Sequence, residues 1–402
     1  MSDAQEMLLQ AKEAFLTFSP GELSEVRAFF APGRVNLIGE HTDYNGGYVL
    51  PAALTLGTWL LVRPRHDGVL RFGSSAFSAQ VSVRADAMVF KEENGFANYP
   101  LGVLWALADL GVRIAGGDFF LIGNLPHSSG LSSSASVEMA MAVAATALAG
   151  EARERVDLIK AAQRAENGFM GVNSGIMDQF AVGMGEAGRA LLLQCATLRY
   201  DSVPLHLSNS QFIIMNTCYP RGLADSKYNE RFAECQTALT QLQAVFPTLT
   251  CLADVSREAW GAASRVLNGD VIMRRARHVI FENARTLAAG QLLKAGDAQA
   301  FGSLMNASHE SLRDDYEVTG PALDAIVESA WSTPGCLGAR MTGAGFGGCA
   351  VALVERDLIP DFVARVGELY RERTGLQAEF YNGDSGDGAR DVTEEAIELW
   401  QS

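Results

Sequence analysis

The chain has 402 residues, enough for two domains of ordinary size, and its 48% hydrophobic and 20% charged residues are typical of a folded globular protein. Its formal net charge of −15 argues against nucleic acid or an anionic membrane as a general partner, because both repel carboxylates. The six cysteines are scattered and form no Cys-x-x-Cys pair, so free thiols are expected rather than a disulfide framework or a metal clip.

The N-terminal segment is predicted to be a helix and not an export signal. Apolar residues from Leu8 to Phe18 recur on one face of a helix over 4–18, and Ser-Pro-Gly follows. The segment has early acids and lacks the basic start of a signal peptide, and the apolar stretch at 49–62 is too short and too interrupted to span a bilayer. The cytoplasm is therefore the expected location.

A polar stretch, GRVNLIGEHTDYNGG at 33–47, follows a strand predicted at 26–30. Arg34, Glu40, His41 and Asp43 fall together there, and loops between strands commonly carry sites. Carboxylates, an imidazole and a guanidinium can pair with several sugar hydroxyls, and a missing hydroxyl would leave a buried partner unsatisfied. A solvated turn with a surface ion pair is the alternative, and composition alone leaves both open.

The remaining elements predict the fold class. Strands are expected at 48–52, 56–63 and 119–122, and helices at 100–110, 132–149 and 151–169. Polar residues 200–210 are interpreted as a linker, before a strand at 212–216, several long helices, a strand at 349–354 and a last helix near Val392. Strands and helices alternate without a regular βαβ period, so the predicted class is α+β and not a doubly wound sheet.

The segment PHSSGLSSSAS at 126–136 leads from a predicted strand into a helix. The first N–H groups of a helix have no intrahelical partner, and the helix dipole favours an anion there. Four hydroxyls at this helix start, beside a glycine, favour phosphate binding over the ordinary serine N-cap that is the alternative. No Gly-x-x-x-x-Gly-Lys-Ser/Thr occurs, so this is not a Walker loop.

Two acids near a second loop are candidates for chemistry. Asp178 follows the glycines of the loop at 171–177 and lies among apolar residues, so it is expected to be partly buried, which suits a general base. Glu166, on the preceding helix, could reach a metal. A helix N-cap for Asp178 and an exposed helix acid for Glu166 remain equally open.

The glycine-rich turn at 343–348 formally contains the dinucleotide fingerprint Gly-x-Gly-x-x-Gly. It leads into a strand and does not open a helix, so the Rossmann interpretation is rejected. A backbone that closes over a ligand and a tight hairpin are both consistent with this turn.

Together these segments resemble the galactokinases, a family within the galactokinase–homoserine kinase–mevalonate kinase–phosphomevalonate kinase (GHMP) superfamily. GRVNLIGEHTDY at 33–44 matches the galactokinase signature along its full length, 125–136 resembles the superfamily phosphate loop, and 343–348 resembles its third motif. Segments 175–180, 225–231, 274–278 and 387–389 are also galactokinase-like. The loop departs from the usual pattern at Ser128, where glycine is common, and Phe232 stands where arginine is frequent.

The resemblance implies a two-domain GHMP-kinase fold with the active site in the cleft between the domains. The N-terminal mixed α/β domain would cover 1–205 and a ferredoxin-like C-terminal domain 206–402. The implied reaction is ATP-dependent phosphorylation of the anomeric hydroxyl of D-galactose to α-D-galactose 1-phosphate, the first committed step of galactose catabolism. The implied enzyme is a monomer that uses MgATP.

The resemblance also implies residue roles. Asp178 would be the base or the orienting carboxylate, and Arg34 would steady it and the transferred phosphoryl group. Ser133 and Glu166 would hold Mg²⁺. The sugar hydroxyls would be bound by Glu40, His41, Asp43 and Tyr228, with the Gly175 backbone nearby. The triphosphate would be wrapped by the 126–136 loop, through Gly130, Leu131, Ser132, Ser133, Ser134, Ala135 and Ser136.

Two alternatives to galactokinase are kept. One is another sugar kinase of the same superfamily, acting on N-acetylgalactosamine or L-arabinose, for which pocket size would decide. The other is a catalytically silent sensor that binds galactose, ATP and then a regulator. Such a sensor should tolerate loss of the base or of the phosphate loop, whereas Arg34, Asp178 and the serine loop are all present here.

Overall fold

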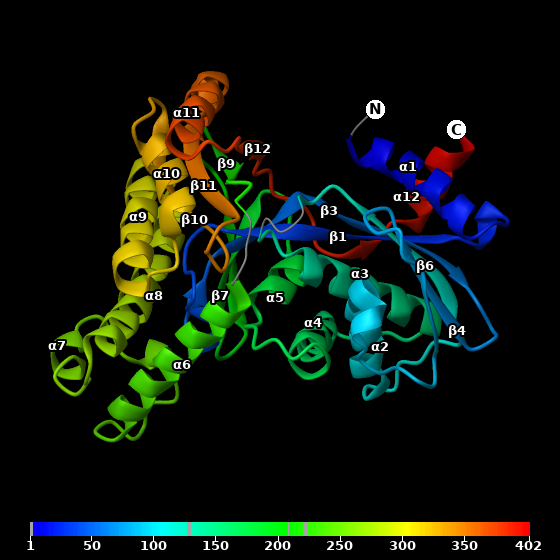
Figure 1. The fold of residues 1–402 in the computed structure, drawn as a ribbon, viewed down its shortest axis with the longest axis horizontal. Coiled ribbons are helices and arrows are strands. Elements are labelled where there is room, and N and C mark those ends of the chain that lie inside the picture. The colour runs from blue at the N-terminus through cyan, green and yellow to red at the C-terminus, as the bar shows by residue number, and fades with distance from the viewer. Residues whose placement is uncertain (1–2, 127–129, 208, 220–223) are drawn as a thin grey trace.

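The computed structural model describes residues 3–126, 130–207, 209–219 and 224–402, so the departure at Ser128 lies outside the described residues. Figure 1 shows two bodies side by side, one carrying α1 to α5 and the other carrying α6 to α11. Each is built on its own sheet, and the sheets are almost entirely antiparallel. This confirms the predicted α+β class.

The N-terminal body is a six-stranded sheet in the order β13-β1-β3-β6-β4-β5. Its strands are β1 (Arg27–Asn36), β3 (Pro51–Pro64), β4 (Val69–Ser74), β5 (Val81–Arg84), β6 (Gly117–Gly123) and β13 (Arg390–Asp391). Only β4 and β6, among the described strands, pair in parallel. Its helices are α1 (Asp3–Phe18), α2 (Asn98–Ala108), α3 (Ser133–Ala149), α4 (Arg155–Arg164), α5 (Met177–Met184) and α12 (Thr393–Gln401).

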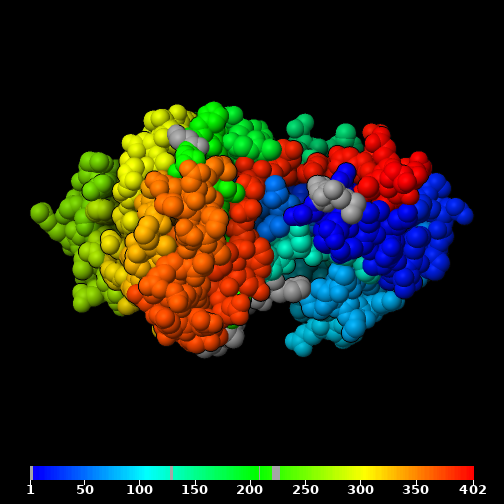
Figure 2. All heavy atoms as spheres, turned by 90° about the horizontal axis from the view of Figure 1, so that it is seen from above, coloured from blue at the N-terminus to red at the C-terminus, as the bar shows by residue number. Residues whose placement is uncertain are grey.

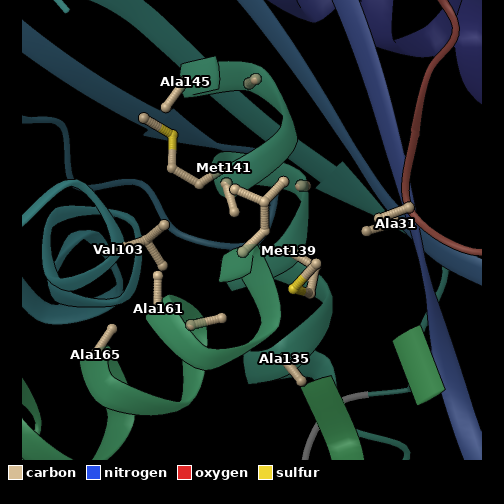
Figure 3. Close-up of a cluster of buried hydrophobic side chains, with 14 of the residues drawn as sticks. Ala31, Val103, Ala135, Met139, Met141, Ala145, Ala161 and Ala165 are labelled. Carbon is tan, nitrogen blue, oxygen red and sulfur yellow. The ribbon is translucent and has the colours of Figure 1, made fainter. Parts of the chain in front are cut away.

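Helices cover both faces of this sheet, so its central strands are nearly continuous apolar runs. On β1, Phe29 packs with α2 to α5, whereas its neighbour Phe30 packs on the opposite face with α1 and α12. Figure 3 shows the first of these cores, to which Met139 and Met141 of α3 and Val103 of α2 all contribute. The small residues of α3 let the helix lie close to the sheet, which positions its N-terminus at the end of β1.

The C-terminal body is a four-stranded antiparallel sheet, β10-β11-β9-β12. Its strands are β9 (Ser210–Asn216), β10 (Cys336–Met341), β11 (Cys349–Glu355) and β12 (Glu379–Asn382). Its helices are α6 (Ala224–Gln243), α7 (Trp260–Ala263), α8 (Asp270–Ala295), α9 (Ala298–Ser311), α10 (Gly320–Trp331) and α11 (Ile359–Thr374). A buried apolar cluster joins the two bodies, with Leu37 and Leu54 from one and Phe212 and Val351 from the other.

A small third sheet corrects one prediction. It consists of β2 (Tyr48–Val49), β7 (Arg189–Gln194) and β8 (Arg199–Pro204). The expected linker over 200–210 is therefore wrong in its first half, because β8 pairs antiparallel with β7 from Arg199 to Pro204. This edge strand is mostly exposed, so it lacks the apolar alternation that marks a half-buried strand.

Short helical turns complete the chain. Turns of 3₁₀ helix lie at Leu23–Glu25, Asp43–Asn45, Glu92–Ala97, Leu252–Asp254 and Arg356–Leu358, and π-helical turns lie at Ala165–Phe169 and Leu312–Tyr316. The predicted helices at 4–18, 100–110, 132–149 and near Val392, and the strands at 119–122, 212–216 and 349–354, are confirmed within a few residues. Among the described helices, none is both long enough and apolar enough to cross a bilayer.

The end of the chain returns to the N-terminal sheet. Strand β13 pairs with β1, and the indole Nε1 of Trp400 donates to the carbonyl of Leu8 at 3.1 Å. Figure 2 shows these last residues, in red, lying against the blue N-terminal ones. The boundary between 205 and 206 remains a prediction, but the segment 390–401 packs on the N-terminal side of it.

Candidate active site

A cavity of about 490 Å³ lies where the two bodies meet. It is lined by the end of β1, the serine loop, the start of α5, the start of α6 and the turn after β10. The predicted site residues on its wall are Arg34, Glu40, His41, Asp43, Gly130, Ser132, Ser133, Ser134, Glu166, Gly175, Asp178 and Tyr228. The side chains of Leu131, Ala135 and Ser136 are instead buried beside the sheet, so only their backbone could serve a ligand.

Arg34 and Asp178 form a two-bond ion pair at the centre of this cavity. The Nε and Nη2 atoms of Arg34 donate to the two carboxylate oxygens of Asp178 at 2.8 and 2.9 Å, and Nη1 donates to the carbonyl of Gly130 at 2.6 Å. An irregularity in the pairing of β1 with β3, just before Arg34, redirects the strand there. Gly33 is needed because a Cβ would lie 2.7 Å from the carbonyl oxygen of Leu131.

Ser132 approaches the same carboxylate from the serine loop. It precedes α3 with φ 61° and ψ 47°, a left-handed conformation that costs a non-glycine residue roughly 1–2 kcal/mol. Its hydroxyl donates to Asp178 at 2.5 Å and does not cap the helix, so the N-cap alternative for this serine is wrong. Asp178 lies in the first turn of α5 after the N-cap Ile176, so its carboxylate is not an N-cap either.

Glu166 lies in the π-helical turn after α4 and is largely buried, at 8% exposure, which contradicts the exposed-acid alternative. Its carboxylate accepts from Ser134 at 2.9 Å, Ser174 at 2.6 Å and Gln179 at 2.9 Å. The serine that contacts Glu166 is thus Ser134, while Ser133 is exposed on the cavity wall. Carboxylate and hydroxyl oxygens are donors that suit a hard divalent cation. No group of three or more His, Cys, Asp or Glu side chains arranged for a metal occurs among the described residues.

A second buried acid stands behind Glu166. Glu138 of α3 is completely buried and accepts a hydrogen bond from Nε2 of Gln179 at 3.0 Å, the same nitrogen that serves Glu166. Burial raises the pKa of Glu138 well above its usual value, and the negative charge of Glu166 raises it further. Both effects favour the neutral form of the Glu138 carboxyl, and only Glu166 of the two acids lines the cavity.

Glu40 is held deep in the wall, not in a solvated turn, so the surface ion-pair alternative is wrong. Its side chain is paired with Arg340 at 2.6 Å and accepts from Asn36, Thr342 and the backbone of Gly343 at 2.6–3.1 Å. Burial raises the pKa of Glu40, and the charge of Arg340 opposes that rise. The sequence analysis did not identify Arg340 as a site residue. Its position as the charged residue of the otherwise uncharged strand β10 was the signal that could have found it.

Asp43 and Gly175 are packed against each other in the cavity wall. A Cβ on Gly175 would come within 1.8 Å of the Oδ2 atom of Asp43, so only glycine lets this carboxylate reach its position. Burial, and next the negative charge of Asp178, raise the pKa of Asp43 to about 7. The Tyr228 ring closes this side of the cavity and lies 5.8 Å, centre to centre, from the ring of His41.

The turn over 343–348 joins β10 and β11, which confirms the hairpin alternative, and its residues Gly343 and Ala344 line the cavity. That its backbone closes over a ligand remains a prediction. Gly343 packs on the serine loop, where a Cβ would lie 3.1 Å from the carbonyl oxygen of Gly130. Gly345 has a φ of 81°, and a Cβ there would lie 2.2 Å from the carbonyl oxygen of Val318. The turn thus needs glycines for close approach of backbone to backbone.

A second cavity of about 460 Å³ adjoins the first. The two share the side chains of Ser133 and Ser134. Its wall is largely apolar and aromatic, with Phe77, Phe96, Tyr99, Leu121, Leu125 and Val137. Nothing in the sequence patterns pointed to these residues, because they come from four separate segments.

Curated relatives match almost the whole chain, and family models match three parts of it that together make up more than half. The model described as the galactokinase galactose-binding signature covers residues 13–64, and those of the GHMP kinase N-terminal and C-terminal domains cover 98–186 and 289–372. The chain is 51% identical to a galactokinase of Exiguobacterium sibiricum, over 93% of this chain and 96% of that protein. It is 47% identical to a galactokinase of Halalkalibacterium halodurans, over 96% and 97%.

Solved structures agree with these relatives. The structure of Lactococcus lactis galactokinase complexed with galactose matches with a TM-score of 0.92 and 44% identity, covering 95% of this chain and 99% of that one. A mevalonate kinase structure matches at 18% identity with a TM-score of 0.61, which shows the shared fold alone. The predicted two-domain GHMP-kinase fold is thereby confirmed.

Proposed function

Since the chain belongs to the galactokinase family of the GHMP kinases, we propose that it transfers the γ-phosphoryl group of ATP to the anomeric hydroxyl of D-galactose. The products are α-D-galactose 1-phosphate and ADP. The observation that carries this proposal is the convergence on Asp178, which Arg34 and Ser132 hold between the sugar signature and the serine loop.

Asp178 is the group placed to accept the proton of the attacking hydroxyl. Its side chain is 29% exposed, so one side is open to the cavity while Arg34 and Ser132 fix its orientation. Phosphoryl transfer requires mainly positioning and neutralisation of charge. Arg34 contributes to both, because its planar fork holds Asp178 and its positive charge lies beside the position of the transferred group.

The serine loop and the second cavity support ATP as the phosphoryl donor. Ser133 and Ser134 lie where the polar cavity joins the apolar one, so a triphosphate at the loop would direct its base toward Phe77, Phe96 and Tyr99. Mg²⁺ would be held by Glu166 and Ser133 and would neutralise charge on the phosphates. The first-turn N–H groups of α3 supply further donors to an anion.

The opposite wall would bind the sugar. His41, Asp43 and Tyr228 surround the cavity with donors and acceptors, and Glu40 closes its base. The Lactococcus lactis relative is complexed with galactose in its solved structure, which supports the same sugar here. A cytoplasmic location, a monomeric state and a place at the first step of galactose catabolism remain predictions.

Sugar-dependent release of ADP tests the proposal. Purified protein with MgATP should turn over with D-galactose and at least about tenfold more slowly, in kcat/KM, with glucose, L-arabinose or N-acetylgalactosamine, because a buried polar group is left unpaired by a wrong hydroxyl. Preference for one of the latter two would favour the alternative kinases. Galactose binding by calorimetry without any ADP release would favour the silent sensor.

A further inference from the structure

A row of hydrogen-bonded side chains leads from His41 away from the cavity into the C-terminal body. The Nδ1 atom of His41 lies 2.9 Å from the hydroxyl of Tyr44, which lies 2.7 Å from the hydroxyl of Tyr316. The Tyr316 hydroxyl lies 3.1 Å from Sγ of Cys235. These side chains come from three distant segments: the 3₁₀ turn Asp43–Asn45 and the residues before it, the π-helical turn Leu312–Tyr316, and α6.

Three of the four side chains in the row are buried, Tyr44 is half-buried, and the row is uncharged. Tyr316 and Cys235 have no exposed surface, and His41 is 4% exposed. Burial lowers the pKa of His41 to about 3 and raises the pKa of Cys235 to about 11, and burial also raises the pKa of both tyrosines. At neutral pH the two hydroxyls and the thiol carry one proton each. If each of these protons is used in one of the three hydrogen bonds, all three bonds point the same way along the row.

The chemistry of the two ends decides that direction. A neutral imidazole nitrogen is the strongest acceptor of the set, and a phenol donates well, whereas a thiol sulfur is only a weak acceptor. The favoured arrangement has Tyr44 donating to Nδ1 of His41, Tyr316 donating to Tyr44, and Cys235 donating to Tyr316. In the reverse arrangement the phenol of Tyr316, a strong donor, would donate to the sulfur of Cys235, which is a weak acceptor.

The other ring nitrogen of His41 is available for a ligand. Nε2 is buried and has no hydrogen-bond partner of ordinary geometry among the described residues, although the backbone of Ala344 is close enough to the ring to raise the pKa of His41 slightly against the effect of burial. The side chain lines the cavity, so a bound sugar could replace that contact. With Nδ1 accepting from Tyr44, the ring proton of a neutral imidazole resides on Nε2.

We propose that Tyr316 and Cys235 are positioning residues that fix His41 as the neutral Nε2–H tautomer, so that His41 donates a hydrogen bond to one oxygen atom of the sugar. Neither residue lines the cavity. The inference rests on the proposed sugar-binding role of His41 and specifies which way that hydrogen bond points.

The tautomer of the His41 ring can be determined directly by NMR. Long-range ¹H–¹⁵N spectra of histidine-labelled protein distinguish the Nε2–H from the Nδ1–H form, and His41→Gln identifies the signals of His41. The expected result is the Nε2–H pattern in the wild type and a mixture in Tyr316→Phe, which keeps the ring beside His41 but removes the hydroxyl. An Nδ1–H pattern in the wild type would overturn the proposal, even if every variant failed to fold.

Kinetics test the consequence for the sugar. Loss of one oriented hydrogen bond should raise the KM for galactose in Tyr316→Phe by about five- to tenfold, with kcat and the KM for ATP changed by less than about twofold. Cys235→Ala should raise the KM by about twofold, and Cys235→Ser, a stronger donor of similar size, should restore it. Tyr381→Phe is the matched control, because its hydroxyl bonds the exposed Glu379 on β12.

A set of monodeoxygalactoses separates positioning from general damage. The Tyr316→Phe penalty should vanish for the one deoxysugar that lacks the oxygen bound by His41 and persist for the others. An equal penalty on every sugar, or none on galactose, would contradict the proposal. Failure of the proposed function looks different, because the wild type would then show no turnover with galactose while its tautomer could still be read.

Discussion

The sugar signature and the serine loop line the same cavity, but they are held in different ways. In the signature, Glu40 is paired with Arg340 and bonded to Gly343, and Gly39 N–H donates to Glu282, all from the C-terminal body. The described bonds of the serine loop run mainly to Arg34, Asp178 and Glu166 of the N-terminal body. The wall proposed to bind the sugar, which carries Glu40, His41 and Asp43, is thus held by residues of the C-terminal body. In the wall proposed to bind phosphate, which carries Ser132, Ser133 and Ser134, the exposed Ser133 remains open to a ligand.

Removing Arg340 should break the sugar wall and have the largest effect on stability. Arg340 is completely buried, pairs with Glu40, and donates to Ser308 and to the backbone of Asn36. Arg340→Met leaves a buried carboxylate without its cation, so urea unfolding should show a loss of roughly 3–5 kcal/mol. Arg373→Met, which breaks an exposed pair with Glu328, should cost no more than about 1 kcal/mol. Equal losses in the two variants would show that the wall is not pre-organised by this pair.

Asp178→Asn tests the residue at which both walls meet. The amide cannot accept the hydroxyl proton, so kcat should fall at least about a hundredfold while the KM values change little. The protein should still fold, although with some loss of stability, because one oxygen remains to accept from Arg34 or Ser132 while the buried Arg34 loses its anionic partner. Asp201→Asn, at an exposed ion pair with Lys294, is the control. A kcat close to that of the wild type would remove Asp178 from the chemical step.

The pH dependence of galactose binding tests Asp43 on the sugar wall. The pKa of Asp43 is raised to about 7, so the carboxylate that we propose to accept sugar hydroxyls forms only as the pH rises through that value. Binding measured by calorimetry without nucleotide should tighten about tenfold from pH 6 to pH 8, since about a tenth of the groups are ionised one unit below the pKa. Asp43→Asn should bind more weakly and lose this slope. A slope that persists in the variant would assign the titration to another group.

The smallest effect is expected at Ser132, on the phosphate wall. Ser132→Ala removes one of the hydrogen bonds to Asp178, but the two bonds from Arg34 remain. We expect kcat to fall about three- to tenfold, in line with the net contribution of roughly 0.5–1.5 kcal/mol from one ordinary hydrogen bond, because Arg34 continues to orient the carboxylate. Ser303→Ala, on the exposed face of α9, should be silent. A loss as large as that of Asp178→Asn would mean that the serine loop, and not Arg34, orients the base.

The residues of this site that lie in short contiguous segments could be predicted from the local sequence. Arg34, Glu40, His41 and Asp43 come from one contiguous segment, and the serine loop and Asp178 stand at helix starts, where chemistry and local geometry coincide. The linker predicted over 200–210 was wrong in its first half, because the exposed edge strand β8 shows no apolar alternation. Ser134 could not be distinguished from Ser133 as the contact of Glu166, since adjacent serines differ only in which way the first turn of α3 points them.

The sequence by itself determined the α+β class, the order of most elements and the residue types of the two walls, because helix periods, strand alternation and glycine turns are set by near neighbours. Only the tertiary structure decided which residues and strands that are distant in the sequence pair with each other. Arg340 meets Glu40, Tyr316 meets Tyr44, and β13 completes the sheet begun by β1, each across more than 250 residues. Such pairings depend on how the whole chain folds back on itself, which no local pattern encodes.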